Sequence, residues 1–305
     1  MTRPLVLAHP GLGGFEALFG QTYEIVRLPA DPATLQARAA VVVGSIGLPR
    51  DALERAPHLQ LIACFGAGTD GVDRALCAAR GIAVTNCPAI NHEDVADVAL
   101  GLLISTARNI AAGDRLVRSS GWSGPMAFAP ARRLRGRKLG IVGLGAIGAA
   151  FATRAAALGL DVRWTGPRPK PDAPYPFEPD LAALAAWADV LAVCAPGGAA
   201  TDKLIDAGVI AALGPDGMLI NVARGSLVDE DALIDALKAG RLGSAGLDVF
   251  ATEPTPPARW ADVPNVTLTP HLGGATREAI MESAQLVLEN LRRFFAGDPL
   301  ATPAP

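Results

Sequence analysis

The chain has 305 residues, half of them apolar, and a formal net charge of −3. This length suffices for one large domain or two smaller ones, and a nearly balanced charge without blocks of one sign gives no reason to expect a nucleic-acid or membrane partner. The four cysteines are scattered and form no C-x-x-C pair, which argues against a metal site or a disulfide framework and favours a reduced, cytoplasmic compartment.

Short apolar runs alternate with helical patterns along the chain. The first run, 5–8, is too short for a signal peptide. The longest apolar helix candidate, 95–107, is well short of a membrane span, and we expect it to be buried between two bodies. The alternation predicts an α/β protein with two doubly wound parallel sheets. The expected strands are 5–8, 41–44, 59–64, 82–85, 138–142, 161–165, 190–194, 218–222, 244–249 and 266–269.

A glycine motif, 143–148, follows the apolar strand 138–142 and opens a helical pattern. In this context Gly143 allows a tight turn, Gly145 lets backbone N–H groups approach a pyrophosphate, and Gly148 lets helix and strand pack closely. The helix N-terminus, at Ala146 and Ile147, adds partial positive charge. The motif therefore predicts a dinucleotide site, whereas an ordinary glycine-rich turn is the simpler alternative.

The next strand, 161–165, ends without the carboxylate that would bind the adenosine ribose. Gly166 takes that place, and two cations, Arg168 and Lys170, follow it. A 2′-phosphate would be repelled by an aspartate and attracted by these cations, so NADPH is favoured over NADH. The alternative is that both cations are merely solvated surface charges.

Two further strand ends carry candidate catalytic residues. His271 follows strand 266–269 and precedes a glycine pair, and Arg224 follows strand 218–222 with a glycine after it. The carboxyl edge of a parallel sheet is where such folds bind ligands. The planar fork of an arginine suits the carboxylate and carbonyl of a 2-keto acid. Glu253 would be only a loop carboxylate unless it meets His271. The other three histidines are as well explained by solvated or capping roles.

The combination of these segments resembles the D-isomer-specific 2-hydroxyacid dehydrogenase family, nearest its NADPH-dependent glyoxylate/hydroxypyruvate and hydroxyphenylpyruvate reductase branch. The similar segments follow the family's order from about residue 60 to about residue 280. They are Phe65-Gly66-Ala67-Gly68-Thr69-Asp70, Asp94-Val95-Ala96-Asp97, the glycine motif, 221–225, 246–250, Glu253-Pro254 and 269–274.

The resemblance implies a mechanism and a set of contacts. Arg224 would hold the substrate carboxylate and keto oxygen, with help from backbone N–H groups at Ala67 and Gly68. His271 would donate the proton during reduction, and Glu253 would bond to it and raise its pKa. Asp248 would meet the nicotinamide amide. Further cofactor contacts are expected at Cys194, Pro196, Val222 and Gly273, and no metal is expected.

The resemblance also implies a domain arrangement and a homodimer. Residues 1–97 with 275–305 would form a flavodoxin-like substrate domain, and residues 98–274 an inserted Rossmann dinucleotide domain, with the active site in the cleft between them. The segment 108–135 would form a dimer-building arm in which Trp122 or Phe128 is buried, although ordinary packing within one chain is an equal alternative for both aromatics.

Other functions stay open at this stage. Some relatives of this fold are dinucleotide-sensing co-repressors that retain the same Arg, Glu and His, so those residues do not separate the two classes. A phosphoglycerate dehydrogenase is disfavoured because no regulatory domain follows residue 300 and the strand-end acid is missing. Glyoxylate, hydroxypyruvate and larger 2-keto acids all satisfy the same arginine and histidine.

Overall fold

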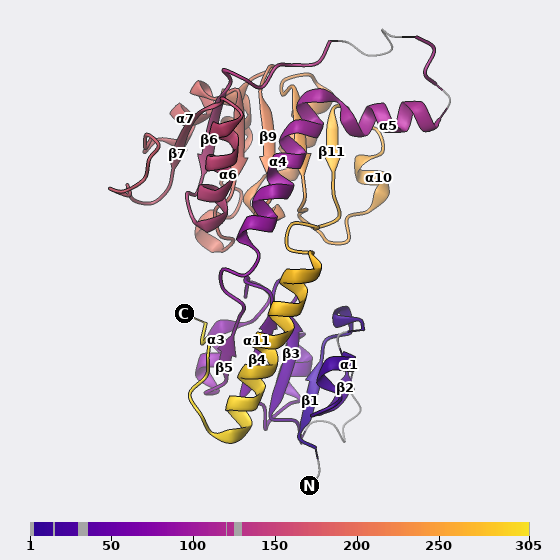
Figure 1. The fold of residues 1–305 in the computed structure, drawn as a ribbon, viewed down its shortest axis with the longest axis vertical. Coiled ribbons are helices and arrows are strands. Elements are labelled where there is room, and N and C mark those ends of the chain that lie inside the picture. Colours follow the sequence, from indigo (N-terminus) through magenta and orange to yellow (C-terminus); the bar gives the residue numbers. More distant parts are fainter. Residues whose placement is uncertain (1–2, 15, 30–35, 120, 125–129, 305) are drawn as a thin grey trace. The chain divides into compact units, whose positions relative to one another are not determined.

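A computed structural model describes residues 3–14, 16–29, 36–119, 121–124 and 130–304, which divide into two compact units (Figure 1). Unit 1 comprises residues 1–91 and 274–305, and unit 2 comprises residues 92–273. The chain therefore passes between the units twice, at 91/92 and at 273/274. The boundary expected at 97/98 would cut through a helix, α4, which runs from His92 to Arg108.

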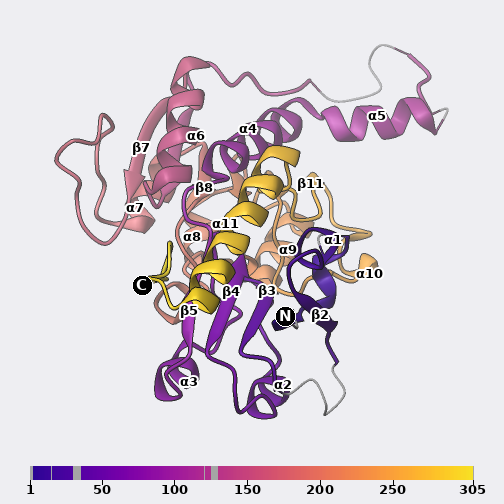
Figure 2. The same ribbon diagram turned by 60° about the horizontal axis from the view of Figure 1, so that its bottom comes forward.

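Unit 1 contains a five-stranded parallel sheet in the order β2-β1-β3-β4-β5, which is the flavodoxin-like order. The helix α11 lies across β4, where its Val287 and Leu291 are buried with Val6 and Leu61 of the sheet (Figure 2). Other apolar side chains, among them Leu7, fill the opposite face. The elements are β1 (Leu5–Ala8), α1 (Glu16–Phe19), β2 (Glu24–Arg27), β3 (Ala39–Val43), α2 (Arg50–Glu54), β4 (Leu61–Phe65), α3 (Arg74–Ala79), β5 (Ala83–Thr85) and α11 (Arg277–Ala296).

Unit 2 contains a six-stranded parallel sheet in the order β11-β10-β9-β8-β6-β7. The chain reverses direction across the sheet between β6 and β8, which creates the switch point at which such folds bind ligands. The helices α4 and α6 cover one face, and α7, α8 and α9 cover the other. The elements are β6 (Lys138–Val142), α6 (Ala146–Ala157), β7 (Asp161–Thr165), α7 (Leu181–Trp187), β8 (Val190–Val193), α8 (Ala207–Leu213), β9 (Met218–Asn221), α9 (Glu230–Lys238), β10 (Ser244–Leu247), α10 (Pro257–Trp260) and β11 (Val266–Leu268).

The segment after α4 contains a helix that the sequence did not predict, α5 (Ile110–Arg118). None of its residues is buried, and Ile110 and Val117 are exposed apolar side chains. Trp122 is 63% exposed, and its indole N–H donates to the carbonyl of Gly124. Whether Trp122 is buried in a dimer stays a prediction. Phe128 lies outside the described residues.

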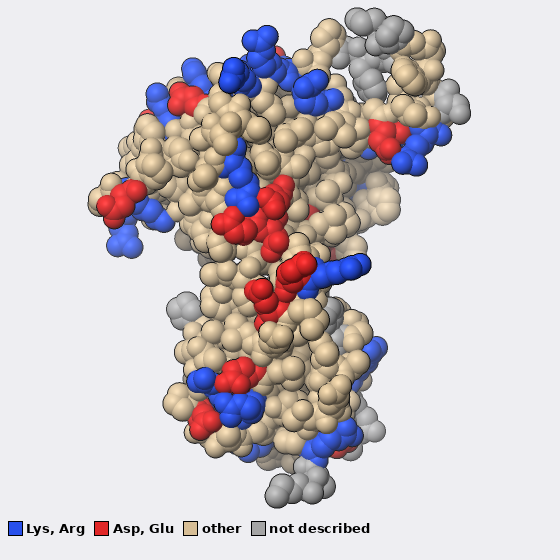
Figure 3. Space-filling view, in the orientation of Figure 1, with Lys and Arg blue, Asp and Glu red and all other residues tan. Residues whose placement is uncertain are grey.

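The face shown in Figure 3 carries small groups of both signs of charge separated by uncharged side chains. No single described helix is long and apolar enough to span a membrane. The pair α4 and α5, which meet at a 64° bend, would be long and apolar enough together, by length and composition only.

Candidate active site

The residues expected to act in catalysis gather at the carboxyl edge of the unit 2 sheet. All six strands are parallel, so their carboxyl ends lie along one edge. Arg224 comes three residues after β9, Asp248 directly follows β10, and His271 comes three residues after β11. The glycine motif begins directly after β6, at the switch point of the same edge.

His271 and Glu253 form a hydrogen-bonded pair. The ring Nδ1 of His271 lies 2.6 Å from the Oε2 of Glu253, whose Oε1 accepts the backbone N–H of Phe250 at 3.0 Å. His271 has a left-handed backbone with φ of 53°, and its own N–H donates to the carbonyl oxygen of Asp248. With Nδ1 held by the carboxylate, Nε2 is the ring atom left for proton transfer.

The charges around this pair favour the imidazolium form. The hydrogen bond that His271 donates to Glu253 raises the pKa of His271 above its usual value, against the opposing effects of partial burial and of Arg224. Burial alone would raise the pKa of Glu253, but the hydrogen bonds from His271 and from Phe250 outweigh it and hold the pKa below its usual value. The pair can therefore keep a proton on His271 near neutral pH.

Two glycines allow close contacts around the half-buried Arg224: Gly197 against its side chain, and Gly225, the next residue, against the backbone of Phe250. A Cβ at Gly197 would lie 2.9 Å from the Cγ of Arg224, and a Cβ at Gly225 would lie 1.9 Å from the carbonyl carbon of Phe250. Asn221 fixes the backbone that leads to Arg224, because its side chain accepts from the N–H of Ala223 and donates to the carbonyl of Arg224. Gly197 was not predicted as a site residue, although its place soon after β8 and next to Gly198 was a usable signal.

Asp248 is a buried carboxylate, 1% exposed, with three internal donors. It accepts from the hydroxyl of Thr269 at 2.6 Å and from the N–H groups of Leu272 and Gly273 at 2.8 Å each. These bonds shape the loop that carries His271. Contact between Asp248 and the nicotinamide amide stays a prediction, as do the cofactor contacts expected at Gly273 and at Val222, which is buried directly after β9.

The glycine motif fits a dinucleotide pyrophosphate. Gly143 has φ of +94°, and a Cβ there would lie 2.7 Å from the Cα of Ala195. A Cβ at Gly148 would lie 2.2 Å from the carbonyl oxygen of Gly143, so turn and helix touch closely. At Gly145, by contrast, the Cβ direction is open beside the N-terminus of α6, where Ala146 and Ile147 present N–H groups without helical partners.

The two basic residues after β7 differ in their surroundings. The ammonium of Lys170 donates to the carbonyl of Leu144 at 2.6 Å, which places it against the glycine motif. Arg168 is exposed and makes no hydrogen bond or ion pair with any residue that the structure describes. Gly166, at the strand end, has the Trp164 ring 3.2 Å from where its Cβ would be.

Ala67 and Gly68 lie in unit 1, in the loop after β4. Gly66 turns this loop with φ of +104°, and the carbonyl of Ala67 accepts from the side chain of Asn86 at 2.7 Å. The carbonyl oxygen of Gly68 lies 1.9 Å from where a Cβ at Gly44 would be, so the loops after β3 and β4 touch backbone to backbone.

Cys194 directly follows β8, and burial raises its pKa to about 12, which makes it an apolar wall residue rather than a nucleophile. Pro196 is exposed two residues further on. Within the described part of the chain, no three His, Cys, Asp or Glu side chains are grouped to hold a metal ion.

Residues 100–273 match the family model described as D-isomer specific 2-hydroxyacid dehydrogenase, NAD binding domain. The chain belongs to this family. It is an oxidoreductase that interconverts 2-keto and 2-hydroxy acids with a nicotinamide dinucleotide, NAD or NADP. The family expected from the sequence, the enzyme class and the two parallel-sheet domains are thereby confirmed.

Several 2-hydroxyacid dehydrogenase relatives cover most of the chain. A glyoxylate/hydroxypyruvate reductase of Arabidopsis thaliana is 39% identical over 88% of this chain and 83% of the relative. A 2-ketogluconate reductase of Gluconobacter oxydans is 39% identical over 87% of this chain and 86% of the relative. The crystal structure of an NADPH-dependent glyoxylate/hydroxypyruvate reductase from Sinorhizobium meliloti, in complex with NADP and malonate, has a TM-score of 0.91 at 37% identity and covers 99% of this chain and 97% of that chain.

Proposed function

We propose that this dehydrogenase reduces a small 2-keto acid of the glyoxylate or hydroxypyruvate type to the D-2-hydroxy acid, using NADPH. The observation that carries the proposal is the His271–Glu253 pair, at 2.6 Å, on the same sheet edge as Arg224 and the glycine motif. The names of the relatives from Arabidopsis thaliana and Sinorhizobium meliloti support the substrate class. The 2-ketogluconate reductase keeps a larger 2-keto acid as the second candidate.

Substrate binding and proton transfer are assigned to different side chains. Arg224 binds the substrate carboxylate with its planar fork and polarises the keto oxygen, with Ala67 and Gly68 as additional proposed N–H donors. The nicotinamide cofactor, when bound, supplies the hydride. The Nε2 of His271 gives its proton to the oxygen as negative charge develops there, and Glu253 stabilises the imidazolium before transfer. In the oxidative direction His271 accepts that proton.

A panel of 2-keto acids with NADPH and with NADH tests this function. We expect turnover of glyoxylate or hydroxypyruvate, and we expect Arg224→Ala to abolish most of it while dinucleotide binding persists, because the lost fork contacts substrate rather than cofactor. Arg224→Lys should restore activity only in part, since a point charge lacks the bidentate geometry. Absence of turnover on every acid would refute the proposal and favour a dinucleotide-sensing binding protein. Near-normal kcat/KM in the alanine variant would remove Arg224 from the site.

We also propose NADPH as the preferred cofactor and the cytoplasm as the compartment. The bound NADP in the Sinorhizobium meliloti structure supports the first, together with the position of Lys170 beside the glycine motif and the exposed Arg168. The four cysteines, which are all buried and unpaired, are consistent with the second.

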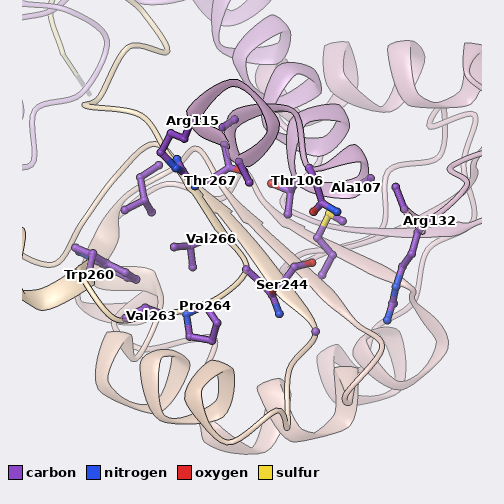
Figure 4. A pocket seen from close by; sticks show the side chains of 18 of the residues that line it. Thr106, Ala107, Arg115, Arg132, Ser244, Trp260, Val263, Pro264, Val266 and Thr267 are labelled. Atoms are coloured by element: carbon purple, nitrogen blue, oxygen red, sulfur yellow. The ribbon is translucent and has the colours of Figure 1, made fainter. Parts of the chain in front are cut away.

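A homodimer built through α5 is the proposed assembly. Ile110 and Val117 on α5 are exposed apolar side chains, and exposed apolar surface of this kind can mark a protein–protein interface. A cavity of about 770 Å³ lies beneath α5 along the edge strand β11, where Trp260, Val266 and Thr267 line it (Figure 4). Its lining includes the first residues of β9 and β10 and the whole of β11, but none of the residues assigned above to catalysis or to the cofactor. A second copy related by twofold symmetry would cover both surfaces at once.

Light scattering after size exclusion tests the dimer. We expect Val117→Glu to shift the mass from dimer to monomer, whereas Ile46→Glu, a change at a similarly exposed apolar residue of unit 1, should leave the dimer intact. A monomeric unmodified protein, or a Val117→Glu protein that remains dimeric, would refute this assembly.

A further inference from the structure

Glu230 is a buried carboxylate outside the residues assigned to catalysis. It is the first residue of α9 and is only 7% exposed. A buried carboxylate is costly unless hydrogen bonds and a counter-charge satisfy it. The capping of α9 does not explain its burial, because the neighbouring Asp229 is the N-cap and its side chain accepts the N–H of Ala232 at 3.1 Å. The reason for burying Glu230 therefore lies in what its two oxygens contact.

Those contacts lead to the loop that carries Glu253. The Oε2 of Glu230 accepts the backbone N–H of Ala251 at 2.9 Å. Its Oε1 pairs with the guanidinium of Arg259 on α10, which also contacts Asp231. Residues 251–254 are all exposed, so apolar packing does little to hold this stretch of backbone. A buried charge-assisted bond to Ala251 is the kind of contact that can fix it.

The backbone at 250–251 touches the proposed catalytic residues in two directions. The N–H of Phe250 donates to Glu253, whose other oxygen lies 2.6 Å from the ring of His271. The carbonyl of Phe250 also packs directly against Gly225, where a Cβ would lie 1.9 Å from the carbonyl carbon. Because the peptide 250–251 shares the Cα of Phe250 with the preceding peptide, its movement would disturb both the His271–Glu253 pair and the backbone next to Arg224.

We propose that Glu230, held by Arg259, is a positioning residue that fixes the peptide 250–251 and so sets the geometry of the His271–Glu253 pair and of the backbone beside Arg224. Its effect on catalysis rests on the function proposed above for His271 and Arg224. Its effect on the geometry of the pair does not.

The test compares three variants. Glu230→Ala removes both contacts. Glu230→Gln keeps an oxygen that can accept from Ala251 but loses the ion pair. Asp231→Ala is the matched control, because Asp231 is 80% exposed and pairs with the same Arg259, whereas its side chain makes no hydrogen bond to the described residues 250–254. The thermal unfolding of each variant is first compared with that of the unmodified protein to show that the variant folds. If Glu230→Ala does not fold, the proposal is tested with Glu230→Gln.

The decisive measurement is a titration of the His271 ring by NMR in histidine-labelled protein. The charged groups that face this ring are Glu253, Asp248 and Arg224. Asp248 keeps its own three donors in every variant, so a change reports on Glu253 or Arg224. We expect the His271 pKa to fall in Glu230→Ala, to fall less in Glu230→Gln, and to stay at the unmodified value in Asp231→Ala.

Kinetics give the second readout. Because misplacing a catalytic group by about 1 Å can cost on the order of 10²-fold in rate, we expect kcat for keto-acid reduction to fall by roughly ten- to a hundredfold in Glu230→Ala, with the KM for the dinucleotide unchanged. A folded Glu230→Ala protein with an unaltered His271 titration would overturn the proposal. If the unmodified protein turns over no 2-keto acid, the proposed function fails, but the NMR titration still decides whether Glu230 positions the pair.

Discussion

Replacing Gly197 by alanine is a small change that should act directly on Arg224. The new Cβ would lie 2.9 Å from the Cγ of Arg224 and 3.6 Å from its Cβ, whereas ordinary carbon contacts begin near 3.4 Å. The Cγ is close to the backbone, so moving it swings the guanidinium at the far end of the side chain. Asn221 holds the Arg224 backbone, which leaves the side chain to absorb the shift. A displacement of about 1 Å of a substrate-binding group can cost on the order of 10²-fold.

We therefore expect kcat/KM for the keto acid to fall by roughly ten- to a hundredfold in Gly197→Ala, or about 1.4–2.8 kcal/mol of transition-state stabilisation. Steady-state kinetics measure this loss, and fluorescence titration with NADPH should show unchanged dinucleotide affinity. Gly101→Ala is the matched control, because Gly101 lies on α4 and a Cβ there meets nothing within 4 Å apart from the helix's own backbone. Unaltered kcat/KM in Gly197→Ala would refute the view that the Arg224 side chain needs this space.

The other predictions concern the proton and the cofactor. Glu253→Gln removes the carboxylate that raises the pKa of His271, so the descending limb of the reduction pH profile should move to lower pH; an unmoved limb would exclude Glu253 from this role. His271→Ala should lower kcat by roughly 10²–10⁴-fold if His271 donates the proton. The double change Arg168→Ala with Lys170→Ala should raise the KM for NADPH and hardly alter that for NADH. Charge-assisted contacts of about 1.5–3 kcal/mol each set the upper limit of this effect before solvent screening. Gly166→Asp added to that background should turn the cofactor preference toward NADH. If the unmodified enzyme has equal KM values for NADPH and NADH, and the double change alters neither, the two cations are only surface charges.

The strands of unit 2 were predictable because parallel strands buried on both faces form short, continuous apolar runs between turns. Arg224 and His271 were found through those strand ends, since a parallel sheet brings all its carboxyl ends to one edge. In unit 1 the sequence missed β2, because its residues Glu24–Arg27 form a partly exposed edge strand with a charged residue at each end. It missed α5 because this helix buries no face within its own chain.

Periodicity and spacing alone do not predict tertiary contacts within loops. Glu253 lies in an irregular stretch whose backbone has no periodicity, so its contact with His271 was expected from the family resemblance only and not from the local pattern. Glu230 follows a helix N-cap, where an acidic residue is usually solvated and stabilised by the helix dipole. Nothing in that local pattern indicates that its carboxylate turns inward to the peptide at Ala251.

The split composition of unit 1 has a consequence for how the protein is made. The sheet face that contains Val6 and Leu61 is covered by Val287 and Leu291 of α11, which the ribosome delivers only after the whole of unit 2. At typical elongation rates of about 5–20 residues per second, synthesis of the intervening residues takes on the order of ten seconds or more, and that face stays uncovered until α11 has been made. During this interval the nascent N-terminal segment presents an apolar surface that chaperones can bind, while unit 2, which is continuous in sequence, can complete its core first.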